Sequence, residues 1–147
     1  MRYALPPAVA MLIAAFAASE PTRPEGNLHR ISVFRLHDAD TISDCNISLG
    51  FGVALQHQSI RLAGFDAWEI NRTRRTVEVT DEEIALGKEA RDALKALLLE
   101  GEAYIVPENE RRDAYGRLLG SLWIWKDNRW LEVAAWAKAR GYTRDSN

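Results

Sequence analysis

One long amphipathic helix, set between strand-like segments, most constrains the fold of this chain. Thr80-Asp81-Glu82-Glu83 has the pattern of a capping box, with Thr80 as the N-cap and Glu83 at the third helical position. Apolar residues then recur at helical spacing, at Leu86, Ala90, Leu94, Leu97 and Leu98. The pattern predicts a helix from about residue 81 to 100, whose apolar face covers one end of a β-sheet.

Five strand-like segments surround this helix. Three precede it: from His29 to a turn at Asp38-Ala39-Asp40, from Thr41 to a turn at Gly50-Phe51-Gly52, and from Val53 to Ala63. Two follow it, Ala103 to Val106 and Leu118 to Trp125, and then a turn at Lys126-Asp127-Asn128 and a second helix from Leu131 to Arg140. Five strands with a helix after the third match an α+β fold, the five-stranded Greek-key barrel of the OB-fold type.

Size and composition fit one soluble domain. The chain has 147 residues, of which 47% are hydrophobic and 27% charged. A net charge of −2 does not by itself mark a binder of polyanions, so any nucleic-acid contact depends on local arginines or a bound cation. The single Cys45 excludes an internal disulfide and a cysteine-based zinc site, and we expect it to be a small buried hydrophobe.

The N-terminus has the features of a secretory signal. Arg2 is followed by an unbroken apolar run from Ala8 to Ala18, too short to span a bilayer, and Ala15-Phe16-Ala17 offers a cleavage pattern. We therefore expect a signal peptide at 1–18, a linker at 19–27 and one domain at 28–147. The alternatives are an uncleaved anchor or a short core helix. Export predicts a secreted or periplasmic protein without stable membrane association after cleavage.

Five short segments carry most of the chemically active side chains. They are Asp38-Ala39-Asp40-Thr41, Arg61-Leu62, Asp66-Ala67-Trp68-Glu69, Gly87-Lys88-Glu89-Ala90 and Asp113-Ala114-Tyr115-Gly116-Arg117. Carboxylates such as Asp40 and Asp66 suit a hard divalent cation, and no Cys or His cluster competes for a softer metal. Arginine suits phosphate, because its planar guanidinium matches two phosphate oxygens and stays charged.

In this order the segments resemble the staphylococcal nuclease (thermonuclease) family, over roughly residues 30 to 143. The family pattern is Asp-Gly-Asp-Thr, Arg-Leu, Asp-x-Pro-Glu, Gly-x-Glu-Ala and Asp-x-Tyr-Gly-Arg. The resemblance implies that Asp40, Asp66 and the carbonyl of Ala67 bind Ca²⁺. It also implies that Glu69 is the general base or orients the water, and that Arg61 and Arg117 bind the phosphate.

Two further residues are expected to contact the substrate. Tyr115 resembles the tyrosine at the family's nucleotide pocket, and Lys88 could line a path for phosphates. Each site residue also has a simpler reading. The aspartates could form a solvated turn, the arginines could pair with them, Glu69 and Lys88 could be ordinary surface charges, and Tyr115 could be an aromatic residue at the edge of the core.

The chain departs from the family pattern in three places. Ala39 replaces a glycine, which would cost roughly 1 kcal/mol if that position needs a positive φ. Trp68 replaces a proline, so we expect a less rigid loop. The sequence stops soon after the second helix, so we expect the family's third helix to be missing.

The favoured function is a calcium-dependent endonuclease of low sequence specificity. The resemblance implies that it attacks DNA and/or RNA through water and leaves 3′-phosphate ends, and we expect it to be a monomer. The alternative is a non-catalytic OB-type module that binds nucleic acid or protein. A third class, a structural or interaction domain with an exposed barrel surface, rests only on the short C-terminus.

Overall fold

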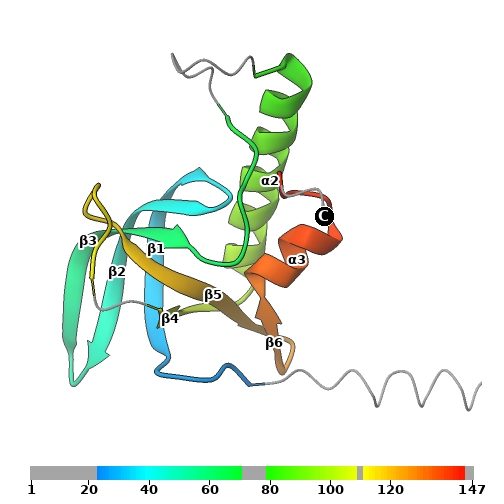
Figure 1. The fold of residues 1–147 in the computed structure, drawn as a ribbon. Helices are drawn as coiled ribbons and strands as arrows, with labels where there is room; N and C mark the ends of the chain where they lie inside the picture. The colour runs from blue at the N-terminus through cyan, green and yellow to red at the C-terminus, as the bar shows by residue number, and fades with distance from the viewer. Residues whose placement is uncertain (1–22, 71–78, 109–110, 145–147) are drawn as a thin grey trace, which may run out of the picture.

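The computed structural model describes residues 23–70, 79–108 and 111–144. These residues form six strands and two helices, in the order β1 (His29–Asp38), β2 (Thr41–Gly50), β3 (Val53–Leu62), α2 (Asp81–Glu100), β4 (Glu102–Pro107), β5 (Leu118–Lys126), β6 (Arg129–Glu132) and α3 (Val133–Ala139). The strand order is β3-β2-β1-β4-β5-β6, and β3 also pairs with β5 (Figure 1). Strands β1 to β5 therefore close into a barrel, which confirms the predicted OB-fold-type α+β fold.

Two seams of the barrel are short. Strands β1 and β4 are antiparallel with only two paired positions, His29 with Ile105 and Arg30 with Tyr104. Strands β3 and β5 are parallel and pair over residues 60–62 and 118–120. The second seam joins segments that lie on either side of the long helix in the sequence, and it determines how the candidate site is assembled.

Helix α2 begins and ends as the sequence predicts. The Glu83 N–H donates to Thr80 Oγ1 at 3.2 Å, and the Thr80 N–H donates to Glu83 Oε2 at 3.3 Å, which completes the capping box. Its apolar face is buried against the barrel at Ala90, Leu94 and Leu97, and Cys45 is buried in the same core, as predicted. The long helix thus covers one end of the barrel (Figure 1).

The predicted start of the second helix is wrong by two residues. Leu131 belongs to β6, which forms a hairpin with β5, and α3 begins only at Val133. Trp130 pairs across this hairpin with Trp125, at 4.9 Å between ring centroids, and meets Tyr104 edge to face at 5.2 Å. These aromatic contacts come from other strands, so the local helical spacing could not reveal them.

The predicted signal peptide at 1–18 lies outside the described residues, as does the first part of the predicted linker, up to residue 22. Across the part of the chain that is described, no helix combines the length and the apolar character needed to cross a bilayer.

Candidate functional site

Arg61 lies between two carboxylates that come from different parts of the chain. Its Nη1 is 2.8 Å from Asp40 Oδ2, and its Nη2 pairs with Asp66 Oδ1. Arg61 is on β3, Asp40 is in the turn between β1 and β2, and Asp66 is in the coil after β3. The structure thus brings together three of the residues that the sequence singled out.

The guanidinium of Arg61 also contacts the backbone. Nη1 is within hydrogen-bonding distance of three carbonyl oxygens, those of Asp40 at 3.2 Å, Leu62 at 3.1 Å and Phe65 at 3.3 Å. The side chain is 23% exposed, whereas that of Asp66 is 58% exposed. Arg61 therefore holds the coil after β3 in place, and one edge of the site faces solvent.

Asp40 is almost buried and accepts several hydrogen bonds. Its Oδ2 accepts from the Ala67 N–H at 2.6 Å, and its Oδ1 accepts from the Thr41 hydroxyl at 2.9 Å. The Asp40 N–H in turn donates to Asp38 Oδ1 at 3.2 Å. These bonds fix the direction of the Asp40 carboxylate and tie the turn before β2 to the coil that carries Asp66.

Burial raises the pKa of Asp38 from 3.8 to about 7, with the hydrogen bond to the Asp40 side chain and its negative charge acting in the same direction. The Asp38 carboxyl is therefore partly protonated near neutral pH. This proton lowers the negative charge that Arg61 faces at the turn.

The raised pKa makes stability depend on pH. A carboxyl whose pKa is higher in the folded state contributes stability below its unfolded pKa of 3.8, and this contribution is lost as the pH rises through about 7. In the wild-type protein the free energy of unfolding should fall between pH 4 and 7. In Asp38→Asn this fall should be smaller by at least about 1 kcal/mol. Urea denaturation with chelator present measures this, with the exposed Asp92→Asn as control. A decline as steep in Asp38→Asn as in the control would contradict the prediction.

The coil that carries Ala67, Trp68 and Glu69 is held at both sides. Ala67 forms an antiparallel bridge with Thr143, and Trp68 Nε1 donates to the Gly141 carbonyl at 3.4 Å. On the other side, a Cβ added at Gly87 would lie 2.7 Å from the carbonyl oxygens of both Trp68 and Glu69. Glycine in the Gly87-Lys88-Glu89-Ala90 segment therefore allows the coil to pack directly on α2.

Ala39 and Trp68, which depart from the family pattern, both have ordinary roles in this structure. Ala39 is fully buried and is not among the described residues with a positive φ, so the condition under which alanine would be strained here is not met. Trp68 lacks the rigidity of proline, but its indole bonds to the backbone of Gly141. Contact with the C-terminal segment thus restrains a loop that the sequence alone predicted to be loose.

Arg117 is held by its own loop. Asp113 Oδ1 accepts from the backbone N–H groups of Tyr115 at 2.9 Å and Arg117 at 2.8 Å, and Asp113 Oδ2 accepts from Arg117 Nε at 2.7 Å. Gly116 has a φ of 77° and lets the chain turn back between these bonds. Partial desolvation raises the pKa of Asp113, but these hydrogen bonds outweigh it and leave that pKa below its ordinary value.

Asp113 is therefore a positioning residue that sequence reasoning missed. It occupies Nε of the guanidinium, and among the described residues no hydrogen bond engages the two terminal nitrogens of Arg117. The only sign in the sequence was its place at the head of the Asp113-to-Arg117 segment. An aspartate followed by a turn and an arginine four residues later can bond both the turn and the side chain.

The pairing of β3 with β5 places the two arginines near one another. Arg61 is paired with Leu119, and Ile60 with Leu118, the residue that directly follows Arg117. Paired residues of neighbouring strands point to the same face, and Arg61 and Arg117 both lie on the face opposite to that of the buried Ile60 and Leu62. Both guanidinium groups are thus on the outside of the barrel wall.

A hollow of about 340 Å³ lies beside Arg61 and Asp66. Glu108 and Leu119 are among its lining residues, and the Ser121 hydroxyl donates to Glu108 Oε1 at 2.9 Å. Glu108 is a second residue that sequence reasoning missed, because it lies outside every segment that carried the resemblance.

The remaining predicted residues lie around this centre without a direct contact to it. Glu69 Oε1 is 3.5 Å from Arg144 Nη1, and both side chains are partly exposed. Tyr115 is 75% exposed, and the guanidinium carbon of Arg117 lies 5.2 Å from its ring centroid. Lys88 is exposed on α2, directly after the glycine that touches the Glu69 backbone.

The oxygen atoms around Arg61 are of the kind that a hard cation prefers. Asp40 and Asp66 each pair with a different terminal nitrogen of the Arg61 guanidinium, which lies between them, and the other oxygens at this point are backbone carbonyls. No group of three or more His, Cys, Asp or Glu side chains within the described ranges could enclose a metal. A cation bound here would therefore need carbonyls and waters in addition to the two carboxylates.

A closed five-stranded barrel with a long helix after its third strand defines an OB-fold domain, and carboxylates and arginines gather at one side of its wall. The family model for staphylococcal nuclease homologues matches residues 59–141, which is more than half of the chain. The chain therefore belongs to the staphylococcal nuclease homologue family. The matched region contains Arg61, Asp66, Glu69 and Arg117, whereas Asp40 precedes it. No match is found among curated proteins.

Proposed function

We propose that this protein is a calcium-dependent nuclease that hydrolyses phosphodiester bonds of DNA and/or RNA with low sequence specificity. The observation that carries the proposal is the convergence of Asp40 and Asp66 on Arg61 at the outer wall of the barrel. Membership of a nuclease-type family supports the same class of substrate.

Different candidate residues would bind the cation and accept the proton. Asp40, Asp66 and the Ala67 carbonyl would hold Ca²⁺, which when bound supplies positive charge next to the scissile phosphate. Glu69 accepts a proton from the attacking water as the water oxygen forms a bond to phosphorus. The bond from phosphorus to the 5′ oxygen breaks, the 5′ oxygen takes up a proton from solvent, and a 3′-phosphate end remains.

The two arginines stabilise the charge that grows on the phosphate. Terminal nitrogens of Arg117 are available for phosphate oxygens and for the leaving 5′ oxygen, because Asp113 engages only Nε. Arg61 would bind a phosphate oxygen through Nη2, the nitrogen that now pairs with Asp66. Tyr115 lies beside Arg117 and offers an exposed ring to the nucleotide.

The second candidate function is a nucleic-acid-binding module without catalysis. The observation that favours it is the engagement of Arg61 with the backbone of its own loop, which gives this residue a structural role apart from any phosphate. The same surface would then bind phosphates but not cleave them.

A cleavage assay separates the two candidates. We expect the purified protein to degrade a fluorescently labelled oligonucleotide with Ca²⁺ present and to lose this activity in excess chelator, because Asp40 and Asp66 offer a hard cation only oxygen ligands. The double variant that carries both Asp40→Asn and Asp66→Asn should lose cleavage even with Ca²⁺ present. Undiminished cleavage in chelator would refute calcium dependence, and binding without cleavage under every condition would favour the module.

A further inference from the structure

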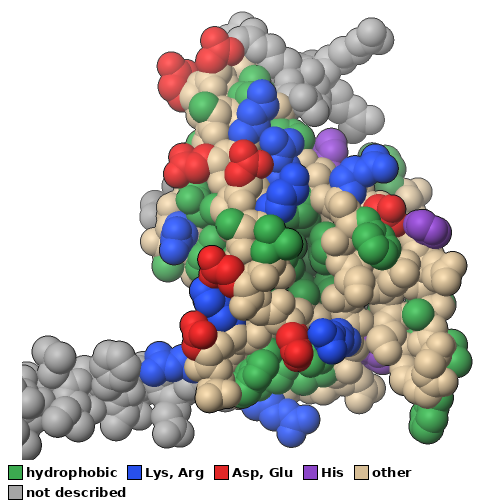
Figure 2. Space-filling model, turned by 180° about the vertical axis from the view of Figure 1, so that it is seen from behind, with side chains coloured by type: hydrophobic (Ala, Val, Ile, Leu, Met, Phe, Trp, Pro, Cys, Tyr) green, Lys and Arg blue, Asp and Glu red, His purple; other side chains and the backbone are tan. Residues whose placement is uncertain are grey.

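Three cationic side chains form a row along one flank of α2. Lys88, Arg91 and Lys95 are spaced three and four residues apart, so they lie on one side of the helix over about two turns. Seen from behind, Lys and Arg side chains gather in a row along this helix (Figure 2). The row begins next to Gly87, which contacts the backbone of Glu69, and therefore starts at the candidate site.

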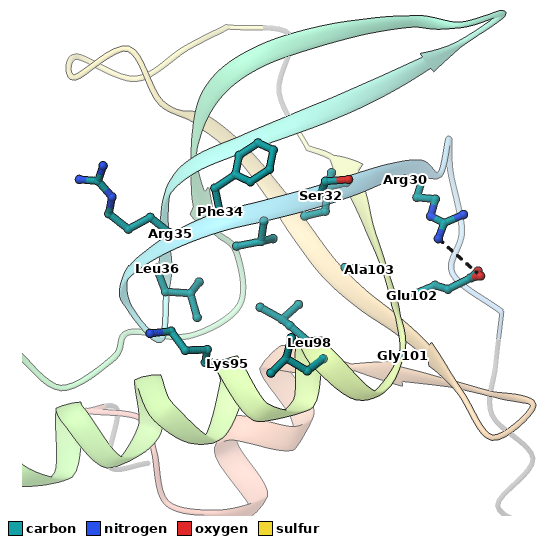
Figure 3. A pocket seen from close by; sticks show the side chains of 13 residues that line it. Arg30, Ser32, Phe34, Arg35, Leu36, Lys95, Leu98, Gly101, Glu102 and Ala103 are labelled. Atoms are coloured by element: carbon teal, nitrogen blue, oxygen red, sulfur yellow. Dashed lines mark ion pairs between the residues drawn. The ribbon is translucent and has the colours of Figure 1, made fainter.

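The far end of the row opens into a groove between α2 and β1. The groove has a volume of about 260 Å³, and its lining includes Arg30, Phe34, Arg35, Lys95, Leu98 and Glu102. It exists because β1 pairs with β4 only at His29 and Arg30, so the helix instead of a strand covers the rest of this edge. Lys95 and Leu98 extend from α2 on one side of the groove, and Phe34 and Arg35 extend from β1 on the other, with the Phe34 ring turned away from the helix (Figure 3).

The groove carries an uncompensated positive charge. Three of the cations, Lys88, Lys95 and Arg35, are exposed. None of the three makes an ion pair with another described residue. Arg91 is paired with the adjacent Asp92 at 3.3 Å, and Arg30 with Glu102 at 3.6 Å. The second of these pairs neutralises the end of the groove, so the cationic path has a defined length.

Phe34 adds an aromatic surface to this path. Its side chain is 58% exposed, and it lies next to Arg35 on β1. Cations in a row with an exposed aromatic ring at the end are the pattern by which proteins bind single-stranded nucleic acid, with phosphates on the cations and a base on the ring. An acidic peptide would use the cations but would gain less from the ring.

We propose that Lys88, Arg91, Lys95, Arg35 and Phe34 form a track that binds a single strand of nucleic acid beyond the nucleotides held at the candidate site. The track deepens the proposed function, because it predicts that the protein engages a polymer and prefers longer strands. Its ligand is defined by chemistry: a phosphodiester backbone with at least one unstacked base.

Binding can be measured without cleavage, which separates this inference from the proposed function. Fluorescence anisotropy with labelled dT4 and dT12 in chelator, at several salt concentrations, reports affinity and the number of phosphate contacts. The variants are Arg35→Glu, Lys95→Glu and their combination, with the exposed Lys138→Glu on α3 as a control that matches the charge change of each single variant. Labelled rU12 compares RNA with DNA.

We expect the wild-type protein to bind dT12 more tightly than dT4. The Arg35→Glu, Lys95→Glu double variant should weaken dT12 binding by about tenfold or more, and should lower the slope of log K against log salt by about 1.4, since each lost phosphate contact on a single strand accounts for ~0.7. Phe34→Ala should weaken dT12 binding about tenfold with little change in the slope, because stacking involves no counterion.

Two results would overturn the track. One is a double variant that binds dT12 like Lys138→Glu. The other is an oligoglutamate peptide that competes with dT12 as strongly as unlabelled dT12 does and is equally sensitive to the double variant. If the wild-type protein binds as expected but never cleaves, the track stands and the proposed nuclease activity fails.

Discussion

Replacing Arg117 with alanine is expected to lower the rate of oligonucleotide cleavage by about 10²–10³-fold. A guanidinium aimed at the phosphate stabilises the transition state more than the ground state, because negative charge grows on the phosphate as the water attacks. The fold should be retained, since Asp113 still accepts the backbone N–H groups of Tyr115 and residue 117 in the variant. Circular dichroism and turnover under saturating substrate measure the two effects.

The matched control for this substitution is Arg112→Ala. Arg112 lies in the same loop and bonds the Gly116 carbonyl at 3.0 Å, but it plays no part in the proposed chemistry. Arg117→Lys should recover only part of the loss, because an ammonium lacks the planar fork. A turnover in Arg117→Ala within a few-fold of the Arg112→Ala value would show that the Asp113-to-Arg117 loop does not act on the phosphate.

Replacing Glu69 with glutamine is expected to lower turnover by about 10²–10⁴-fold, the usual contribution of a general base. Glutamine has nearly the same shape but cannot take a proton from the attacking water. Stability should change little, because the ion pair between Glu69 and Arg144 is partly exposed and such pairs contribute little. The measurement is turnover as a function of pH.

The pH profile distinguishes a base from a residue that only shapes the loop. Loss of the acidic limb of the profile in Glu69→Gln, together with the lower rate, supports proton transfer by Glu69. The control is Glu82→Gln, an exposed carboxylate in the first turn of α2. A rate in Glu69→Gln equal to that of this control would remove Glu69 from the mechanism.

The helix bounds and the strands were predictable, because they depend on residues that are close together in the sequence. The bounds of α2 follow from a capping box and helical spacing, and the structure shows both bonds of that box. The five strands of the barrel follow from alternation and turns, since these patterns are local as well, and the barrel class that their order matched was supported by the resemblance. The resemblance was confirmed by the family model over residues 59–141.

Features that depend on distant contacts were not predictable. The strand at 129–132 is held by aromatic partners on β4 and β5, and the strain expected at Ala39 required a dihedral angle that no pattern supplies. The roles of Asp113 and Glu108 likewise depend on side-chain directions. The sequence indicated that Asp40, Arg61 and Asp66 serve one site, but not that Arg61 would bridge the other two.

The short seam between β3 and β5 ties the order of folding to the completion of the site. Arg61 lies on one side of this seam and Arg117 enters from the other, with the whole of α2 and β4 between them in the sequence. Bringing such distant segments together has the loop-closure cost of a long chain, whereas the β1–β2 and β2–β3 hairpins form from neighbours. Closing the barrel and placing the two guanidinium groups on one face are therefore a single event. A chain with its hairpins and helix formed but its seam open would hold Asp40 and Arg61 without Arg117.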